Sequence, residues 1–65
     1  MKQIKIVIPE NMAMHVAKYT FENAIRVILS YSKDEFFTLQ IVVICALEAE
    51  KEAAFTTEFK NYIKA

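Results

Sequence analysis

A chain of 65 residues with a single cysteine and a single histidine must fold without an internal disulfide and without a zinc site of the usual kind. Domains of this length bury only about 60% of the surface that their unfolded chains expose, so their stability is marginal. The common supports are disulfides, a metal ion or a partner subunit. A disulfide needs a second cysteine, and a structural zinc ion needs four ligands. Association with another molecule is the support that the sequence leaves open.

Composition argues against several classes of function. Eight basic residues balance eight acidic ones, and Arg26 is the only arginine, whereas nucleic-acid binders carry clustered basic residues. The chain has no glycine, which excludes the glycine-dependent loops that bind phosphates and dinucleotides. The most apolar run, Phe36 to Leu47, is roughly 12 residues, and a membrane span needs about 20. We expect no nucleic-acid partner, no membrane partner and no cofactor.

The location of the protein is predicted from its thiol and its first residues. An unpaired Cys45 fits a reducing compartment. Lys2 and Lys5 interrupt the apolar start, and no small-residue cleavage site follows, so no signal peptide is predicted. We expect a soluble cytoplasmic protein.

Hydrophobic periodicity predicts one strand and one helix in the first third of the chain. Gln3 to Ile8 alternates with period two, which is typical of a strand, and Pro9 ends it because proline has no N–H to donate. Glu10 to Asn23 changes to helical spacing. The predicted apolar face of this helix holds Met12, Ala13, Val16, Ala17, Thr20 and Phe21, and the polar face holds His15, Lys18 and Glu22.

The remainder predicts a hairpin and a second helix. Ile25 to Tyr31 and Phe36 to Cys45 are rich in strand-favouring residues, and the polar stretch Ser32 to Glu35 joins them. Ala46 to Ala65 is expected to be helical, with an apolar stripe of Phe55, Phe59, Tyr62 and Ile63. Because Glu48 and Glu52 would otherwise lie near this stripe, we expect either that the helix starts later than Ala46 or that its first turn projects beyond the sheet.

The predicted fold class is α+β, with residues 1–65 as a single small domain. The element order is β-α-β-β-α, which favours a two-layer sandwich of a three-stranded sheet with two helices on one face. The pairing of the first strand, with the second or with the third, stays open at this point.

Alternation divides the strand residues between two faces of the predicted sheet. The face expected to lie under the helices holds Ile4, Ile6, Ile8, Val27, Leu29, Tyr31, Phe37, Leu39, Ile41 and Val43. The other face holds Lys5, Val7, Arg26, Ile28, Ser30, Phe36, Thr38, Gln40, Val42 and Ile44. Two helices on one side leave nothing in the chain to cover this second face.

The second face is half apolar, and its apolar members are the predicted partner-binding residues: Val7, Ile28, Phe36, Val42 and Ile44. Contiguous exposed apolar patches mark interaction sites. Burying five such side chains at ~1.5–3 kcal/mol each would match the whole stability of a small domain. The alternative is a tolerated apolar surface, since single exposed apolar residues are common. We favour the first interpretation, in which the face binds either a different protein or a second copy of the chain in a homodimer.

No set of residues in the sequence predicts an active site. His15 is interpreted as a solvated surface histidine, and Cys45, at the end of an apolar strand, as a small buried hydrophobic residue. Glu48, Glu50 and Glu52 are interpreted as a solvated helix N-terminus, although two of them at a spacing of four residues would suit a shared cation. We expect no catalytic residues, no metal ligands and no enzyme activity.

Two short stretches resemble a known family. Ala17-Lys18-Tyr19-Thr20-Phe21-Glu22-Asn23, followed directly by a hairpin, and the later Phe55-Thr56-Thr57-Glu58-Phe59-Lys60-Asn61-Tyr62 are similar to segments of the HxsD-type accessory proteins of His-Xaa-Ser peptide-maturation systems. The resemblance spans Val16 to Tyr62, and the family's Arg after the Tyr62 position is absent here. It implies a non-catalytic helper that accompanies a radical-SAM enzyme and binds that enzyme or its peptide substrate.

Three hypotheses for function remain. The leading one is an interaction module or accessory subunit that uses the uncovered sheet face. The second is a peptide-binding adaptor that accepts an extended segment on an exposed strand edge. The third is a metal-binding or small-molecule domain that uses Glu48 to Glu52, which a rise in melting temperature with a divalent cation would indicate.

Overall fold

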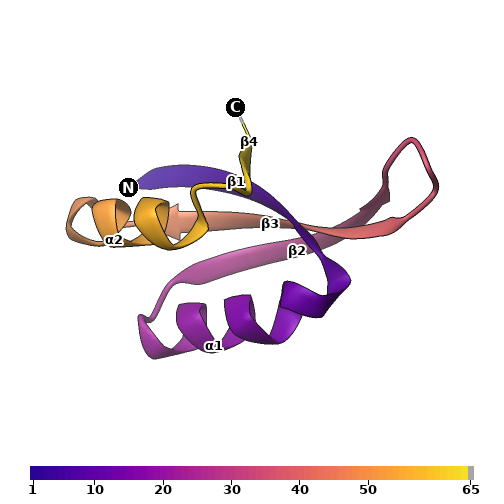
Figure 1. Cartoon of the computed structure of the whole chain (residues 1–65). Coiled ribbons are helices and arrows are strands. Elements are labelled where there is room, and N and C mark those ends of the chain that lie inside the picture. The colour runs from indigo at the N-terminus through magenta and orange to yellow at the C-terminus, as the bar shows by residue number, and fades with distance from the viewer. Residues whose placement is uncertain (65) are drawn as a thin grey trace.

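The computed structural model describes residues 1–64, which form one antiparallel sheet, two α-helices and a short 3-10 helix (Figure 1). The elements in chain order are β1 (Lys2–Pro9), η1 (Glu10–Met12), α1 (Ala13–Glu22), β2 (Arg26–Lys33), β3 (Leu39–Leu47), α2 (Ala49–Phe59) and β4 (Ile63–Lys64). The order of strands across the sheet is β2-β3-β1-β4.

This connectivity is the split β-α-β arrangement, also called ferredoxin-like. β1 pairs antiparallel with β3 over its whole length, which answers the question that the sequence left open. β2 pairs with β3 through the hairpin and forms one edge of the sheet, while β4 forms the other. The predicted α+β class with two helices is confirmed, and the three-stranded sheet is corrected to four strands among residues 1–64.

The fourth strand was predicted as the end of a helix. α2 ends at Phe59, and the chain then reverses so that Val7 N donates a hydrogen bond of 3.0 Å to Tyr62 O. All four residues of the predicted stripe do reach the core: Phe55 and Phe59 from α2, Tyr62 from the turn, and Ile63 from β4, where it pairs with Ile6. The last residue of the predicted helix, Ala65, lies outside the described residues.

The start of α2 and the limits of β3 also differ from the prediction. α2 begins at Ala49, later than Ala46 as expected, because β3 continues to a fully buried Leu47. β3 begins at Leu39 and not at Phe36. The reason is a closed loop: one oxygen of Asp34 accepts hydrogen bonds of 2.9 Å from both Phe36 N and Thr38 N.

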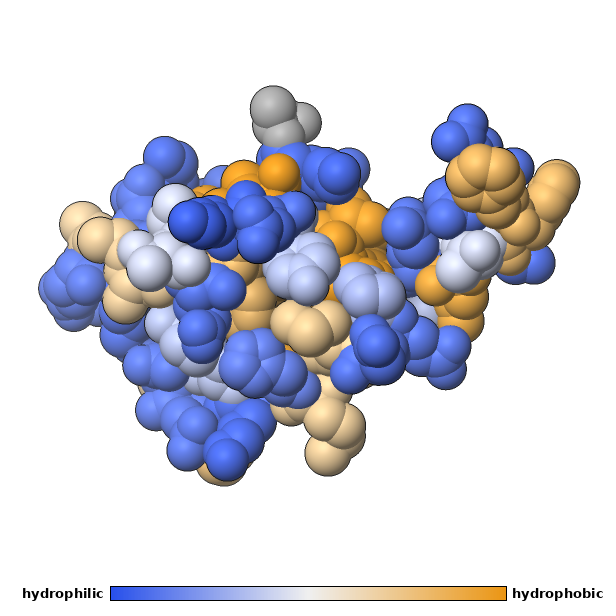
Figure 2. Space-filling model, in the orientation of Figure 1, coloured by the Kyte–Doolittle hydropathy of each residue, from blue (hydrophilic) through white to orange (hydrophobic). Residues whose placement is uncertain are grey.

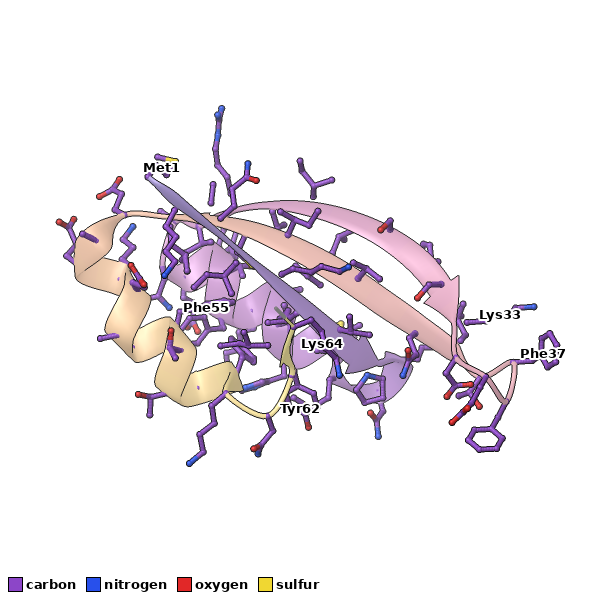
Figure 3. All side chains as sticks on the ribbon, turned by 90° about the horizontal axis from the view of Figure 1, so that it is seen from above. Met1, Lys33, Phe37, Phe55, Tyr62 and Lys64 are labelled. Atoms are coloured by element: carbon purple, nitrogen blue, oxygen red, sulfur yellow. The ribbon has the colours of Figure 1, made fainter. Side chains whose placement is uncertain are left out.

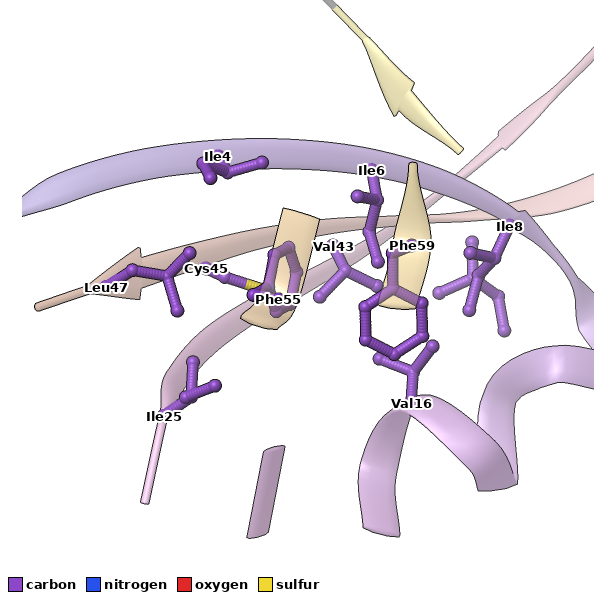
Figure 4. Close-up of a cluster of buried hydrophobic side chains, with 11 residues drawn as sticks. Ile4, Ile6, Ile8, Val16, Ile25, Val43, Cys45, Leu47, Phe55 and Phe59 are labelled. Atoms are coloured by element: carbon purple, nitrogen blue, oxygen red, sulfur yellow. The ribbon is translucent and has the colours of Figure 1, made fainter. Parts of the chain in front are cut away.

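The core lies between the sheet and the two helices and centres on Phe55 and Phe59 of α2 (Figure 4). Its buried hydrophobic residues are Ile4, Ile6, Ile8, Val16, Ile25, Ile41, Val43, Cys45, Leu47, Phe55 and Phe59. The register pairs Ile4, Ile6 and Ile8 with Cys45, Val43 and Ile41, so period-two alternation in both central strands sends these side chains to the helix side.

Aromatic contacts hold α1 close to α2. The Tyr19 ring lies edge-on to Phe55 and Phe59, with centroids 6.2 and 5.2 Å away. His15 makes a similar contact with Phe59 at 5.5 Å. Such pairs contribute about 0.5–1.5 kcal/mol beyond the area that they bury. They favour a position of α1 against α2, away from the β2 edge.

The end of α1 is a Schellman motif built without glycine. Ile25 N donates to Thr20 O at 2.9 Å and Ala24 N to Phe21 O at 3.2 Å, which is the hydrogen-bond pattern of that motif. Ala24 therefore occupies the left-handed position with φ 53°, where its Cβ is unfavourable. Lys51 reinforces the turn by donating to Asn23 O at 2.6 Å.

We expect Ala24→Gly to stabilise the domain by about 1 kcal/mol, because glycine adopts positive φ without the steric cost of a Cβ. The net gain in stability is the steric cost that is relieved, less the stabilisation of the unfolded chain by the greater conformational entropy of glycine. Urea unfolding followed by circular dichroism measures it, with Ala54→Gly on the exposed side of α2 as the control that should lose about 1 kcal/mol. Equal destabilisation by both substitutions would contradict the motif.

Candidate interaction surface around β2

β2 is exposed along its whole length although it carries four large apolar or aromatic residues. The register places Val27, Leu29 and Tyr31 opposite Cys45, Val43 and Ile41 of β3, so these three side chains lie on the helix side of the sheet. Their exposed fractions are 37%, 59% and 69%, while all three partners on β3 are buried. Burial on the helix side therefore stops between β3 and β2.

The sequence prediction was right about the side of Val27, Leu29 and Tyr31 and wrong about their cover. α1 buries only Val16 and Thr20 and is held against α2 by its aromatic contacts. Leu39 is also partly exposed, and Phe37 lies outside the strands, so neither belongs to the covered face. The two helices shelter β1 and β3 and leave the β2 side open.

An apolar groove of about 450 Å³ runs between α1 and β2 on the helix side. Its strand wall is Val27, Leu29 and Tyr31, and its floor includes Ile41 and Val43 of β3. Its helix wall consists of Ala13, Met14, Val16, Ala17, Thr20 and Phe21. Met14 and Phe21 are strongly exposed at the rim, although Phe21 was predicted on the core face. We call this the α1–β2 groove.

The other side of the sheet carries the predicted partner-binding residues. Val7 pairs with Val42 and Ile28 with Ile44, so these four lie on the face away from the helices. Val7, Val42 and Ile44 are half-buried among their neighbours in the sheet, and Ile28 on β2 is 65% exposed. A shallow hollow of about 510 Å³ lies beside Ile28 and Ile44 and is lined also by Gln3, Arg26, Val27 and Ala46. We call this side the open face.

Phe36, the fifth predicted residue, does not lie on the open face. It stands in the loop between β2 and β3, at the end of a hairpin arm that extends from the body, where Figure 3 labels its neighbour Phe37. Both rings are strongly exposed, and Figure 2 shows hydrophobic surface at the end of this arm. Phe37 has φ 60°, an unfavourable conformation for an aromatic residue. The loop thus presents two aromatic side chains to solvent from a fixed turn.

The backbone of β2 offers hydrogen bonds along its outer edge. Asp34 N donates to Thr38 O at 3.1 Å, so these two residues form a hydrogen-bonded pair. This pair determines which of the other opposed residues in the hairpin are hydrogen-bonded to each other. Because hydrogen-bonded pairs alternate in antiparallel strands, Ile28 and Ser30 bond to β3, and the N–H and C=O groups of Val27, Leu29 and Tyr31 point outward. Within residues 1–64 no strand pairs with this edge.

The residues considered for chemistry do not form part of this surface. Cys45 is fully buried in the core, and burial raises the pKa of its thiol to about 11. His15 is half-exposed on α1, with Nε2 3.6 Å from Glu58 Oε1 and its ring against Phe59. The structure does not bring Cys45 and His15 into contact, since His15 faces α2 and the thiol lies in the core between helices and sheet.

The three glutamates at the start of α2 do not gather into one site. Glu48 occupies the N-cap position, and a hydrogen bond with its carboxyl group, together with repulsion between the two charges, raises the pKa of Glu50. Glu52 instead accepts a hydrogen bond of 2.8 Å from Lys2 at the start of β1. Among residues 1–64, no three His, Cys, Asp or Glu side chains are grouped so that they could hold a metal ion.

None of the helices formed by residues 1–64 has the length and apolar character needed to cross a membrane. Comparison of the chain with protein-family models, with curated proteins and with solved structures gave no match.

Sequence reasoning found the open face and missed the α1–β2 groove. Met14, Phe21 and Tyr31 are the most exposed apolar residues of that groove. One signal was available: the predicted apolar face of α1 had six members, a wider stripe than one helix contact in a domain of this size would bury. Which residues of this wide stripe stay exposed depends on how α1 packs, and hydrophobic periodicity carries no information about that packing.

Proposed function

We propose that this chain is a non-catalytic protein–protein interaction module or accessory subunit that binds through β2. The observation that carries the proposal is the exposure of all eight residues of β2, four of which are Val27, Ile28, Leu29 and Tyr31. Apolar side chains therefore leave this strand on both faces, and its outer backbone edge is free within residues 1–64. We call the strand with these four side chains the β2 surface.

The free energy of burying the β2 side chains is large for a domain of this size. Fully burying one large aliphatic side chain is worth about 1.5–3 kcal/mol. A domain of this length is stable by about 3–10 kcal/mol in total. Burial of Ile28, Leu29 and Tyr31 by a partner is thus comparable with the folding free energy itself, which is the support that a small domain without disulfide or metal needs.

A tolerated apolar surface explains the arrangement less well. Isolated exposed apolar residues are common on soluble proteins. Here the exposed residues are consecutive on one edge strand, border a groove and continue onto the open face through Ile28. An exposed apolar edge strand also favours aggregation, and proteins normally protect such edges. Arg26 and Lys33 are the first and last residues of β2 and give its ends a charge, but the four residues that form the β2 surface lie between them.

The second candidate function is a peptide-binding adaptor, which the free edge favours specifically. An extended peptide that adds a strand beside β2 would take its hydrogen bonds from the outward groups of Val27, Leu29 and Tyr31. The resemblance to HxsD-type proteins suggests the setting, a helper of a peptide-modifying enzyme of the radical-SAM type. The two candidates differ in what the partner uses: side-chain burial on the faces of β2, or its backbone edge.

Substitutions on β2 test the proposal against a partner captured from cells that make the protein and then purified. We expect Ile28→Lys and Leu29→Lys each to weaken binding about 10- to 100-fold, since each removes one buried side chain. The control Ala54→Lys adds the same charge on the exposed side of α2 and should bind like the unchanged chain. Titration calorimetry measures all three affinities.

Further variants distinguish binding through the faces of β2 from binding through its backbone edge or through the open face. Val42→Lys and Ile44→Lys probe the open face away from β2, and Leu29→Pro removes one backbone donor from the edge. Loss of binding with Leu29→Pro while Ile28→Lys binds normally identifies an adaptor that uses the edge alone. Unchanged affinity in every β2 variant that keeps its fold would contradict a role of β2 in binding.

A further inference from the structure

We infer that the partner of the β2 edge is a second copy of this chain, paired antiparallel with it about Leu29. The inference rests on the proposed function and names the partner of that surface. Two four-stranded sheets would join, β2 to β2, into one continuous sheet around a two-fold axis that passes midway between the two Leu29 residues at right angles to the sheet.

Backbone geometry allows this pairing. In a pairing centred on Leu29, Leu29 faces its own copy and Val27 faces Tyr31 of the other chain. These are the residues of β2 whose N–H and C=O groups point outward. Both copies therefore contribute donors and acceptors at the same heights along the strand. β4, the other edge strand, has only two residues and offers a much shorter edge.

Side-chain pattern selects the centre. The helix-side stripe of β2 reads valine, leucine and tyrosine at alternate positions, with Leu29 in the middle. Centring the pair on Leu29 sets every apolar residue of the stripe opposite another apolar residue. Moving the centre by one residue to Ser30 would set Val27 opposite Lys33 of the other chain. Apolar cross-strand pairs stabilise a sheet, and a lysine opposite valine does not.

The α1–β2 groove gives the reason for a second copy rather than a bare peptide. A two-fold axis at right angles to the sheet keeps both α1 helices on the same side of it. The two grooves then merge into one trough, with the Val27, Leu29 and Tyr31 side chains of both copies along its floor. Met14 and Phe21 of each α1 wall it from both sides. An extended peptide would satisfy the edge but would bring no second wall.

The surface area of the chain agrees with a dimer. Its accessible surface is 4844 Å², whereas a monomeric protein of this mass is expected to expose about 4,250 Å². The radius of gyration of 11.5 Å also exceeds the roughly 10.7 Å expected for a compact chain of this length. An interface that buried this excess of about 600 Å² on each copy would total about 1,200 Å², the lower limit of specific interfaces.

Light scattering on the purified chain tests the pairing. We expect a mass of about twice 7.5 kDa for the unchanged protein at high concentration. Leu29→Lys should return the mass to that of one chain, because two lysines would then face each other across the axis. The matched control Ile44→Lys places the same charge on the open face and should keep the double mass. Leu29 is more than half exposed, so the substitution leaves the core intact, which circular dichroism verifies.

Two results would overturn the inference. One is the mass of a single chain at every concentration up to about 1 mM. Any dimer would then have a Kd above about 1 mM, which corresponds to a binding free energy weaker than roughly −4 kcal/mol. The other is a dimer that Ile44→Lys dissociates and Leu29→Lys does not, which would place the contact on the open face. Neither result decides the proposed function, because binding of a different partner to β2 is measured separately with the captured protein.

Cysteine cross-linking tests the register. In a pair centred on Leu29, Leu29→Cys faces itself at a Cα separation of about 5.5 Å, which is within the range of a disulfide. Tyr31→Cys is the control on the same side of the same strand, because the two introduced cysteines would lie more than 10 Å apart along the strands. We expect mild oxidation to link Leu29→Cys at least tenfold faster. Equal rates would overturn the proposed register.

Discussion

Phe55→Ala is expected to lower the free energy of unfolding by about 3–5 kcal/mol, among the largest losses expected from any single substitution in this chain. Phe55 is fully buried, and its ring lies 4.9 Å from that of Phe59 and 6.2 Å from that of Tyr19, so it joins both helices to the sheet. Removing a buried phenylalanine ring costs about 3–5 kcal/mol. The total stability expected for this length is about 3–10 kcal/mol, so this loss takes a third or more of it. Urea unfolding followed by circular dichroism measures the change.

The matched control is Phe37→Ala in the hairpin loop. The same ring is removed there, but it is exposed to solvent, and substitutions at such positions change stability by about 0.5 kcal/mol or less. The comparison separates loss of packing from loss of an aromatic residue as such. A destabilisation below 1 kcal/mol for Phe55→Ala would show that the core is not centred on this ring.

The second large effect concerns Cys45. Burial raises the pKa of its thiol from 9.0 to about 11, and the thiolate is the reactive form. At pH 8 this shift lowers the thiolate fraction about 100-fold relative to an unfolded chain. We expect iodoacetamide to alkylate the folded protein at least 100-fold more slowly than the protein in urea, with mass spectrometry as the measurement. Equal rates would mean that the thiol is exposed.

The same shift predicts how stability depends on pH. Folding favours the neutral thiol, so the contribution of Cys45 is constant below pH 9, where the unfolded thiol titrates. It decreases as the pH rises from 9 to about 11, because the unfolded chain then releases a proton that the folded chain retains. Cys45→Ala lacks this decrease and serves as the control. A parallel pH dependence of the two proteins would contradict the buried thiol.

Much of the fold could be predicted because its strands alternate with period two. The pattern from Gln3 to Ile8 needed no tertiary information, and Pro9 marked its end. The fourth strand could not be predicted in this way, since it has only two residues, Ile63 and Lys64, which pair with Ile6 and Lys5 of β1. Two residues carry no period, and the apolar spacing of Phe55 and Phe59 continued by chance into Tyr62 and Ile63 as a helix would.

The candidate surface was predicted in part for a similar reason. Val7, Ile28, Val42 and Ile44 share one face because register and alternation fix the side of every strand residue. Phe36 was misplaced because the loop that holds it closes on the Asp34 side chain, an interaction that hydrophobic periodicity does not detect.

The exposure of the helix side of β2 was not predicted. It depends on where α1 packs, and therefore on ring contacts between residues far apart in the sequence, such as Tyr19 and Phe59. Local patterns assign a residue to a side of the sheet. They do not say how far a helix extends over that side.

Hydrogen exchange of individual β2 amides tests most directly whether the strand is a docking edge. Ile28 and Ser30 donate to β3 and should exchange slowly at every concentration, which makes them internal controls. We expect the amides of Val27, Leu29 and Tyr31 to exchange rapidly in dilute protein and to become protected when a partner is added or when the protein concentration is raised. A docking role of β2 would be contradicted if these three amides exchanged as fast as those of the hairpin loop both in concentrated protein and in the presence of the captured partner.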